Sequence, residues 1–147
     1  MKNNIKAVFF AAILMGLVIS LHGSCNAGEG AFEQLSLELK SQGVSEQFIK
    51  ATQGPVKSML SCAAPMADVR SVLLDLWSEG VKGRALKNAV TAVAELVKSG
   101  DNVLEAEKIA SGAAHKAEAE GLSGFFVGMR VKKAVEERKA YLAALKK

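Results

Sequence analysis

The 147-residue sequence is poor in cysteine, proline and aromatic residues: it has two cysteines, two prolines and 5% aromatics. The few cysteines exclude a disulfide-rich scaffold, and the few prolines exclude a collagen-like repeat. Half of the residues are apolar and 23% are charged, which is typical of a folded chain rather than a disordered one. Because Ala, Val, Leu, Glu and Lys dominate while aromatics are scarce, the composition favours helices over sheets.

Residues 1–27 have the layout of a secretory signal peptide. Two lysines give a positive start, an apolar run covers residues 7–21, and small or polar residues follow as far as Ala27. A membrane-spanning anchor normally needs about 20 apolar residues, and this run is shorter and lacks a basic flank. We therefore expect residues 1–27 to be removed on export and residues 28–147 to form one domain.

A second processing scheme stays open, because Gly23-Ser24-Cys25 resembles the end of a bacterial lipobox. In that scheme Cys25 is lipidated and becomes the new N-terminus, and the acyl chains hold the protein on a membrane. His22 departs from the small or aliphatic residue of a lipobox, which favours the cut after Ala27. Either scheme leaves Cys62 without an intramolecular partner, and its apolar neighbours predict a buried thiol.

Beyond residue 27, apolar side chains recur at three- and four-residue spacing, which indicates helices, and no stretch alternates for long enough to indicate a strand. Glycines 43, 80, 100 and 121 each follow a helical stretch, where a left-handed C-cap is needed. Pro55 is expected to kink a helix rather than end it, because the apolar side stays in phase across it. The sequence predicts an all-α fold, either a small bundle or a short stack of five to six helices, with a basic last helix over about 123–147.

The spacing of these glycines has two interpretations. Gly80, Gly100 and Gly121 lie about twenty residues apart, whereas Gly43 and Gly80 are separated by nearly twice that, with Pro65 between them. A duplicated helix-turn unit would produce such a period. A bundle of five-turn helices with glycine caps would produce it as well.

The sequence offers few groups for catalysis or metal binding. Only His115 remains outside the leader, and neither another histidine nor a thiol lies near it in the sequence, whereas zinc sites need three or four ligands. The chain also lacks a Gly-x-Ser-x-Gly elbow and the lysine-serine ending of a phosphate loop. We therefore predict no catalytic residue, no cofactor and no metal, and we expect His115 at the surface or its boundary. Paired carboxylates remain as the enzymatic alternative.

The last predicted helix carries two features that suggest contacts. Gly124-Phe-Phe-Val-Gly128 has the spacing that lets helices approach closely, so we expect a tight contact with the alanine face of the preceding helix, where Gly112 also lies. The alternative is that Phe125 and Phe126 are exposed and contact a partner or lipid. Residues 130–147 carry a net charge of +5 and residues 28–129 a net charge of −3. This helix either docks by its apolar side, which includes Leu145, or contacts anionic lipid through its basic side chains. The candidate basic residues are Arg130, Lys132, Lys133, Arg138 and Lys139.

These features favour an exported, non-enzymatic helical protein of the bacterial envelope, periplasmic or secreted, that binds a protein partner or self-associates through an apolar face. The alternative is a membrane-surface lipoprotein, held through Cys25 or through contact of its basic helix with anionic lipid. Nucleic acid is the least expected partner, because export separates the chain from most of it and no aromatic stacking platform accompanies the basic residues.

Overall fold

A computed structural model describes residues 27–146, which form six α-helices and, within that range, no strand. The predicted all-α fold is confirmed. Residues 1–26, which include Cys25 and all but the last residue of the predicted signal peptide, lie outside the described range. The helices are α2 (Ala27–Ser41), α3 (Glu46–Ser61), α4 (Met66–Ser78), α5 (Gly83–Lys98), α6 (Val103–Ala119) and α7 (Phe125–Leu145).

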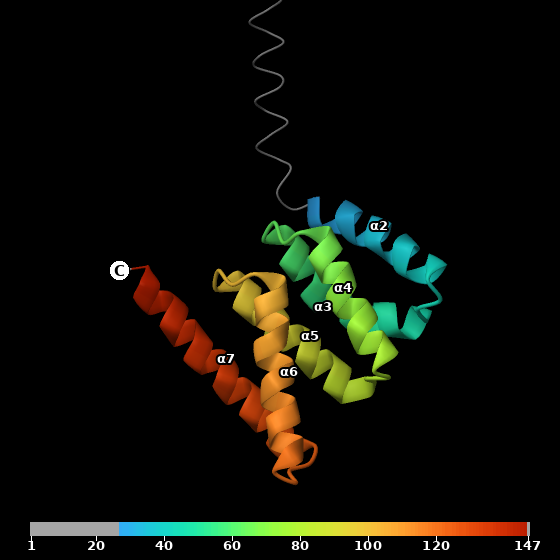
Figure 1. Cartoon of the computed structure of the whole chain (residues 1–147). Helices are drawn as coiled ribbons and strands as arrows, with labels where there is room; N and C mark the ends of the chain where they lie inside the picture. The colour runs from blue at the N-terminus through green and yellow to red at the C-terminus, as the bar shows by residue number, and fades with distance from the viewer. Residues whose placement is uncertain (1–26, 147) are drawn as a thin grey trace, which may run out of the picture.

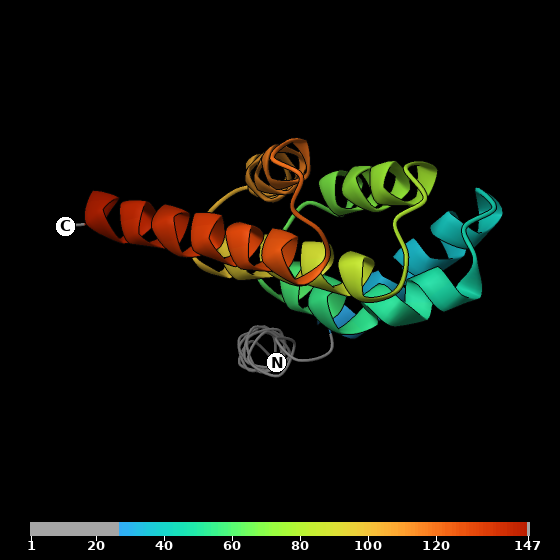
Figure 2. The same cartoon turned by 90° about the horizontal axis from the view of Figure 1, so that it is seen from below.

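The helices lie in two layers (Figures 1 and 2). In one layer α4 contacts α6, and in the other α5 lies between α3 and α7. At the far end from α7, the first helix α2 packs against α3 and α4. Each of these contacts joins helices that are one or two steps apart in the chain. The molecule is therefore a small helical bundle in two layers, and α7 lies at the end of one layer.

All five turns between helices use one hydrogen-bonding pattern. In each turn a backbone N–H donates to the carbonyl five residues earlier, and the residue before that donor has a positive φ. Glycine occupies this left-handed position in four turns, as predicted. In the turn after α3 the left-handed residue is Ala63, with φ of 59°. A turn of the same kind therefore lies between Gly43 and Gly80, where the sequence has no glycine to mark it. The N–H and carbonyl pairs are Val44–Leu39, Ala64–Met59, Val81–Leu76, Asp101–Leu96 and Leu122–Ala117, at 3.0–3.2 Å.

Helix α3 continues through Pro55 and does not end there, as expected. Proline has no N–H, so the carbonyl of Ala51 loses its partner within the helix. Ala51 is exposed, and solvent water can take the place of that donor. The helix therefore keeps its apolar side, which includes Ile49 and Val56, in one line against the core.

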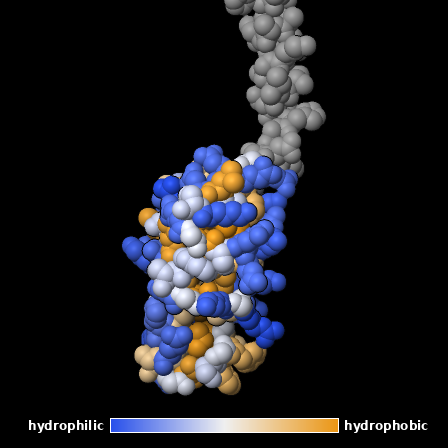
Figure 3. Space-filling view, turned by 90° about the vertical axis from the view of Figure 1, so that its right-hand side faces the viewer, coloured by the Kyte–Doolittle hydropathy of each residue, from blue (hydrophilic) through white to orange (hydrophobic). Residues whose placement is uncertain are grey.

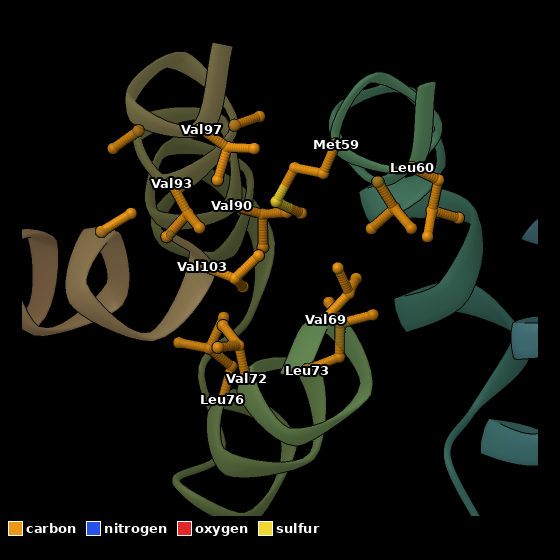
Figure 4. Close-up of a cluster of buried hydrophobic side chains, with 14 of the residues drawn as sticks. Met59, Leu60, Val69, Val72, Leu73, Leu76, Val90, Val93, Val97 and Val103 are labelled. Carbon is orange, nitrogen blue, oxygen red and sulfur yellow. The ribbon is translucent and has the colours of Figure 1, made fainter. Parts of the chain in front are cut away.

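All six helices contribute to the core, and Figure 4 shows side chains that meet in the part between α3, α4, α5 and α6. Val69 of α4, Val90 of α5 and Val103 of α6 are fully enclosed. Trp77 of α4 lies at the edge of this cluster, where its ring meets Phe48 edge-on at a centroid distance of 5.3 Å. The sequence predicts six residues on the apolar side of α5. Five of them are buried, namely Leu86, Val90, Val93, Leu96 and Val97, whereas Ala89 is half-buried.

Cys62 and the glycines near α7 differ from the sequence predictions. Cys62 is exposed rather than buried, because α3 ends at Ser61 and the thiol lies on the cap residue. Gly112 faces open space, so close packing does not account for it. Gly124 is the exposed N-cap of α7, and a Cβ built on Gly128 would lie 3.7 Å from Asn88 Nδ2 on α5. The tight contact expected with the alanine face of α6 does not form at these glycines.

None of the six described helices has the length and hydrophobicity that crossing a bilayer requires.

Candidate interaction surface

The last helix, α7, is covered on one side only. That side packs on α5 and α6, and Val135 is its one buried residue within the described range. Val131, Ala134 and Leu142 are half-buried on the same side. No helix within residues 27–146 covers the opposite side, which we call the outer side of α7. Figures 1 and 2 show α7 at the edge of the molecule.

Large apolar side chains gather on the outer side where α7 begins. Phe125, Phe126 and Met129 are 74%, 57% and 54% exposed, and we call these three residues the aromatic patch. The two phenylalanine rings pack edge-to-face, with centroids 5.7 Å apart. Figure 3 draws the right-hand side of Figure 1, which lies away from α7, and both hydrophilic and hydrophobic side chains are exposed there. The patch therefore exposes apolar area of the kind that interfaces use.

An open groove of about 860 Å³ runs between α5 and α7 beside the aromatic patch. Small residues of both helices, Ala85 and Ala92 of α5 with Gly128 of α7, form part of its lining. Lys132 and Glu95 add charged side chains of opposite sign, so the groove has both apolar and polar contacts to offer. Its length along two helices suits an elongated partner segment better than a small molecule.

Most of the basic side chains singled out in the sequence are engaged by carboxylates. Arg130 Nη2 lies 3.0 Å from Glu120 Oε2, which ties the start of α7 to the end of α6. Lys139 Nζ donates to Glu136 Oε1 at 3.0 Å, and this hydrogen bond raises the pKa of Lys139. These two pairs leave less free positive charge on α7 than its composition suggests.

Three more basic side chains complete this set. Lys133 pairs with Glu137 at 3.8 Å on the outer side. Arg138 is held by two hydrogen bonds to Asp101, which raise the pKa of Arg138. Lys132 lines the groove and forms no ion pair within the described range. The five basic residues therefore do not form one basic face. Arg130 and Arg138 pair with carboxylates of other elements, Lys133 and Lys139 pair within α7, and Lys132 lines the groove.

The outer side of α7 carries one continuous line of exposed residues at alternating three- and four-residue spacing, which we call the outer stripe. From its start the stripe is bulky and apolar, then basic, then acidic, then small. This spacing is that of a coiled-coil seam. The stripe consists of Phe126, Met129, Lys133, Glu136, Ala140 and Ala143, all exposed.

Other reactive groups do not converge. No group of three or more His, Cys, Asp or Glu side chains within the described residues is placed to hold a metal ion. His115 is on the surface, where its Nδ1 lies 3.8 Å from Glu118 Oε2.

The chain matches no protein-family model, no curated protein and no solved structure. The surface of α7 is therefore the feature from which a function can be argued.

The sequence pattern identified part of this surface. Phe125 and Phe126 are exposed, which is the second of the two arrangements considered for them. Met129 and the acidic part of the outer stripe were missed, because apolar residues occur on both sides of α7 and periodicity could not tell which side docks. Leu145, expected on the docked side, is 66% exposed. The signal that could have revealed the stripe is the order of Lys132-Lys133 and Glu136-Glu137, two like-charged pairs one helical turn apart.

Proposed function

We propose that this chain is an exported, non-enzymatic helical module that binds a protein through the outer side of α7. The observation that carries the proposal is the aromatic patch, which exposes Phe125, Phe126 and Met129 together. Interfaces are enriched in aromatic residues and Met, and exposed clusters of such residues mark binding surfaces. The end of a helical array normally presents a polar outer face, so the exposed apolar side chains at the start of α7 are suited to a partner.

Export is supported by the leader-like pattern of residues 1–27. Cleavage after Ala27 would remove one described residue of α2 and leave the other five helices whole. The intact mass of the protein recovered from its own cells tests this step. We expect a chain that begins at Gly28, whereas a diacylated chain that begins at Cys25 would support the lipoprotein alternative.

Binding through α7 can be tested with a photo-crosslinking amino acid placed at Phe126. The full chain is expressed in its own cells, and the same substitution at Leu37, a 69% exposed residue of α2, is the matched control. We expect protein adducts from position 126 and far fewer from position 37. Equal yields from the two positions, or no protein adduct from position 126, would contradict the proposal.

The alternative function is a membrane-surface lipoprotein whose α7 contacts anionic lipid. Lys132, which has no ion pair within the described range, is the side chain that favours it. The ion pairs of Arg130 and Arg138 with carboxylates of the fold argue against it, because they occupy two of the charges that lipid headgroups would need. Lipid adducts from position 126 without protein adducts would support this alternative.

A further inference from the structure

We infer that the protein bound by the outer side of α7 is a second copy of this chain, with the two α7 helices packed antiparallel along their outer stripes. The inference rests on the proposed function, because it names the partner of the same surface. Its basis is that the outer stripe is complementary to itself when reversed. A two-fold axis that passes between residues 134 and 135 pairs the first half of the stripe in one copy with the second half of the stripe in the other copy.

Side-chain size is complementary in this arrangement. Phe126 faces Ala143 of the second copy, and Met129 faces Ala140 of the second copy. All four residues are exposed within the single chain, so they are accessible to a second copy. A bulky side chain opposite a small one lets two helices approach closely, as knobs fit into holes in a coiled coil.

Charge is complementary as well. Lys133 faces Glu136 of the second copy, so the centre of the interface carries opposite charges. In a parallel arrangement Lys133 and Glu136 would each instead meet their own equivalents along the stripe. Like charges across an interface are unfavourable, so the charge order selects the antiparallel arrangement.

The ion pairs within α7 leave these charges available. Lys133 and Glu137 are 3.8 Å apart, and their side chains are 69% and 68% exposed. Glu136, which is 56% exposed, accepts a hydrogen bond from Lys139 of the same helix at 3.0 Å. Such an exposed pair contributes little to stability, and its partners can be exchanged at low cost. The two stripes overlap over residues 126–143, a length of about 26 Å at 1.5 Å per residue. A contact of this size favours a dimer that forms as concentration rises rather than a permanent one.

Charge reversal tests the inference directly. One variant is Lys132→Glu with Lys133→Glu, and the other is Glu136→Lys with Glu137→Lys. The full chain is purified in the form that the host produces, and its native mass is measured as a function of concentration. We expect the unmodified protein to reach twice the monomer mass, each variant alone to stay monomeric at the same concentration, and an equimolar mixture of the two variants to dimerise. The mixture restores opposite charges at all central positions.

Two controls separate dimerisation from folding. Lys50→Glu on α3 breaks an exposed pair with Glu46 at the same four-residue spacing, and it should leave dimerisation unchanged. Ala140→Gln keeps every charge and fills the small position opposite Met129, so it should weaken the dimer without changing helix content. Circular dichroism confirms that each variant is folded.

Three results would overturn the inference: an unmodified protein that stays monomeric at all concentrations, variants that dimerise alone as well as the unmodified protein does, or a mixture that stays monomeric. If the unmodified protein is monomeric but position 126 crosslinks to a different protein, the second copy is excluded and the proposed function stands. If it is monomeric and no protein is crosslinked, both are excluded.

Discussion

Arg138 of α7 holds Asp101 with two hydrogen bonds although 37 residues separate them in the chain. Nε lies 2.7 Å from Oδ2, and Nη2 lies 2.9 Å from Oδ1. The Asp101 side chain is 4% exposed and lies in the turn between α5 and α6, directly after Gly100. The guanidinium also lies over the ring of Tyr141, at 5.2 Å. Arg138 lies on the side of α7 that faces the fold, as buried Val135 does, and the outer stripe lies on the other side.

Replacing Arg138 with Met should lower the thermal midpoint of unfolding clearly more than replacing Lys133 with Met. Both changes remove one basic residue of α7 and keep an apolar stem. Loss of Arg138 leaves a nearly buried carboxylate without its partner, whereas the Lys133 pair is exposed and contributes little. Thermal melts followed by circular dichroism give the comparison, and equal shifts would show that the Asp101 pair does not hold α7.

Replacing Ala63 with Gly should stabilise the protein by about 0.5–1 kcal/mol. Ala63 has a φ of 59°, a conformation in which its Cβ is strained and glycine is not. The matched change is Gly80→Ala, where φ is 71° and no atom would crowd the new Cβ, so strain alone should cost about 1 kcal/mol. Urea titrations measure both, and effects of the same sign would contradict this account of the turns.

Replacing Leu96 with Ala should destabilise the protein by about 2–5 kcal/mol, because the change leaves a cavity in a close-packed core. Leu96 of α5 is fully buried, whereas Leu37 of α2 is 69% exposed. The same truncation at Leu37 should change the free energy of unfolding by less than about 0.5 kcal/mol. Equal shifts of the denaturation midpoint for both variants would contradict the assignment of Leu96 to the core.

The ion pair between Glu29 and Lys57 should make stability depend on pH. The hydrogen bond from Lys57, at 2.6 Å, and its charge lower the pKa of Glu29 below the ordinary value of 4.5. A lowered pKa means that the fold favours the charged carboxylate, so this stabilisation is present above pH 4.5 and is lost as the pH falls through the lowered pKa. The melting difference between the unmodified protein and Glu29→Gln should therefore be seen at neutral pH and vanish in acid.

Glu33 provides the control for this pH dependence. It lies exposed on the same helix and forms no ion pair within residues 27–146. Glu33→Gln should show a smaller melting difference at neutral pH. A difference for Glu29→Gln that persists unchanged in acid would mean that the substitution acts through something other than this charge pair.

The helices could be predicted because two local signals agree along most of the chain. In α5 the apolar stripe from Leu86 to Val97 matches the helical period, and a glycine follows the helix at 100. The turn at Ala63 carries no such mark, because alanine is a strong helix former and only the neighbouring helices fix it in a left-handed conformation. The exposure of Cys62 was missed for the same reason, since it depends on where that turn falls.

The outer side of α7 could be predicted less well because it depends on tertiary packing. Phe125 and Phe126 were singled out by their place between two glycines, but the neighbour of Gly128 is α5 rather than α6. Apolar residues of α7 occur on more than one of its sides, so its sequence is compatible with more than one side packing against the fold. On the side of α7 that faces the fold, Val135 is buried in the core and Arg138 pairs with Asp101. Both contacts depend on the other helices being folded, so the sequence of α7 alone does not reveal them.

The short reach of the helix contacts has a consequence for how the chain folds. Since these contacts join helices one or two steps apart, no segment has to wait for a distant one before it can pack. Proteins built from such nearby contacts fold fast, and they can assemble progressively from one end. If the chain is exported with its N-terminus first, as proposed, α2, α3 and α4 can fold while α7 is still in the membrane channel, and the aromatic patch is then exposed last.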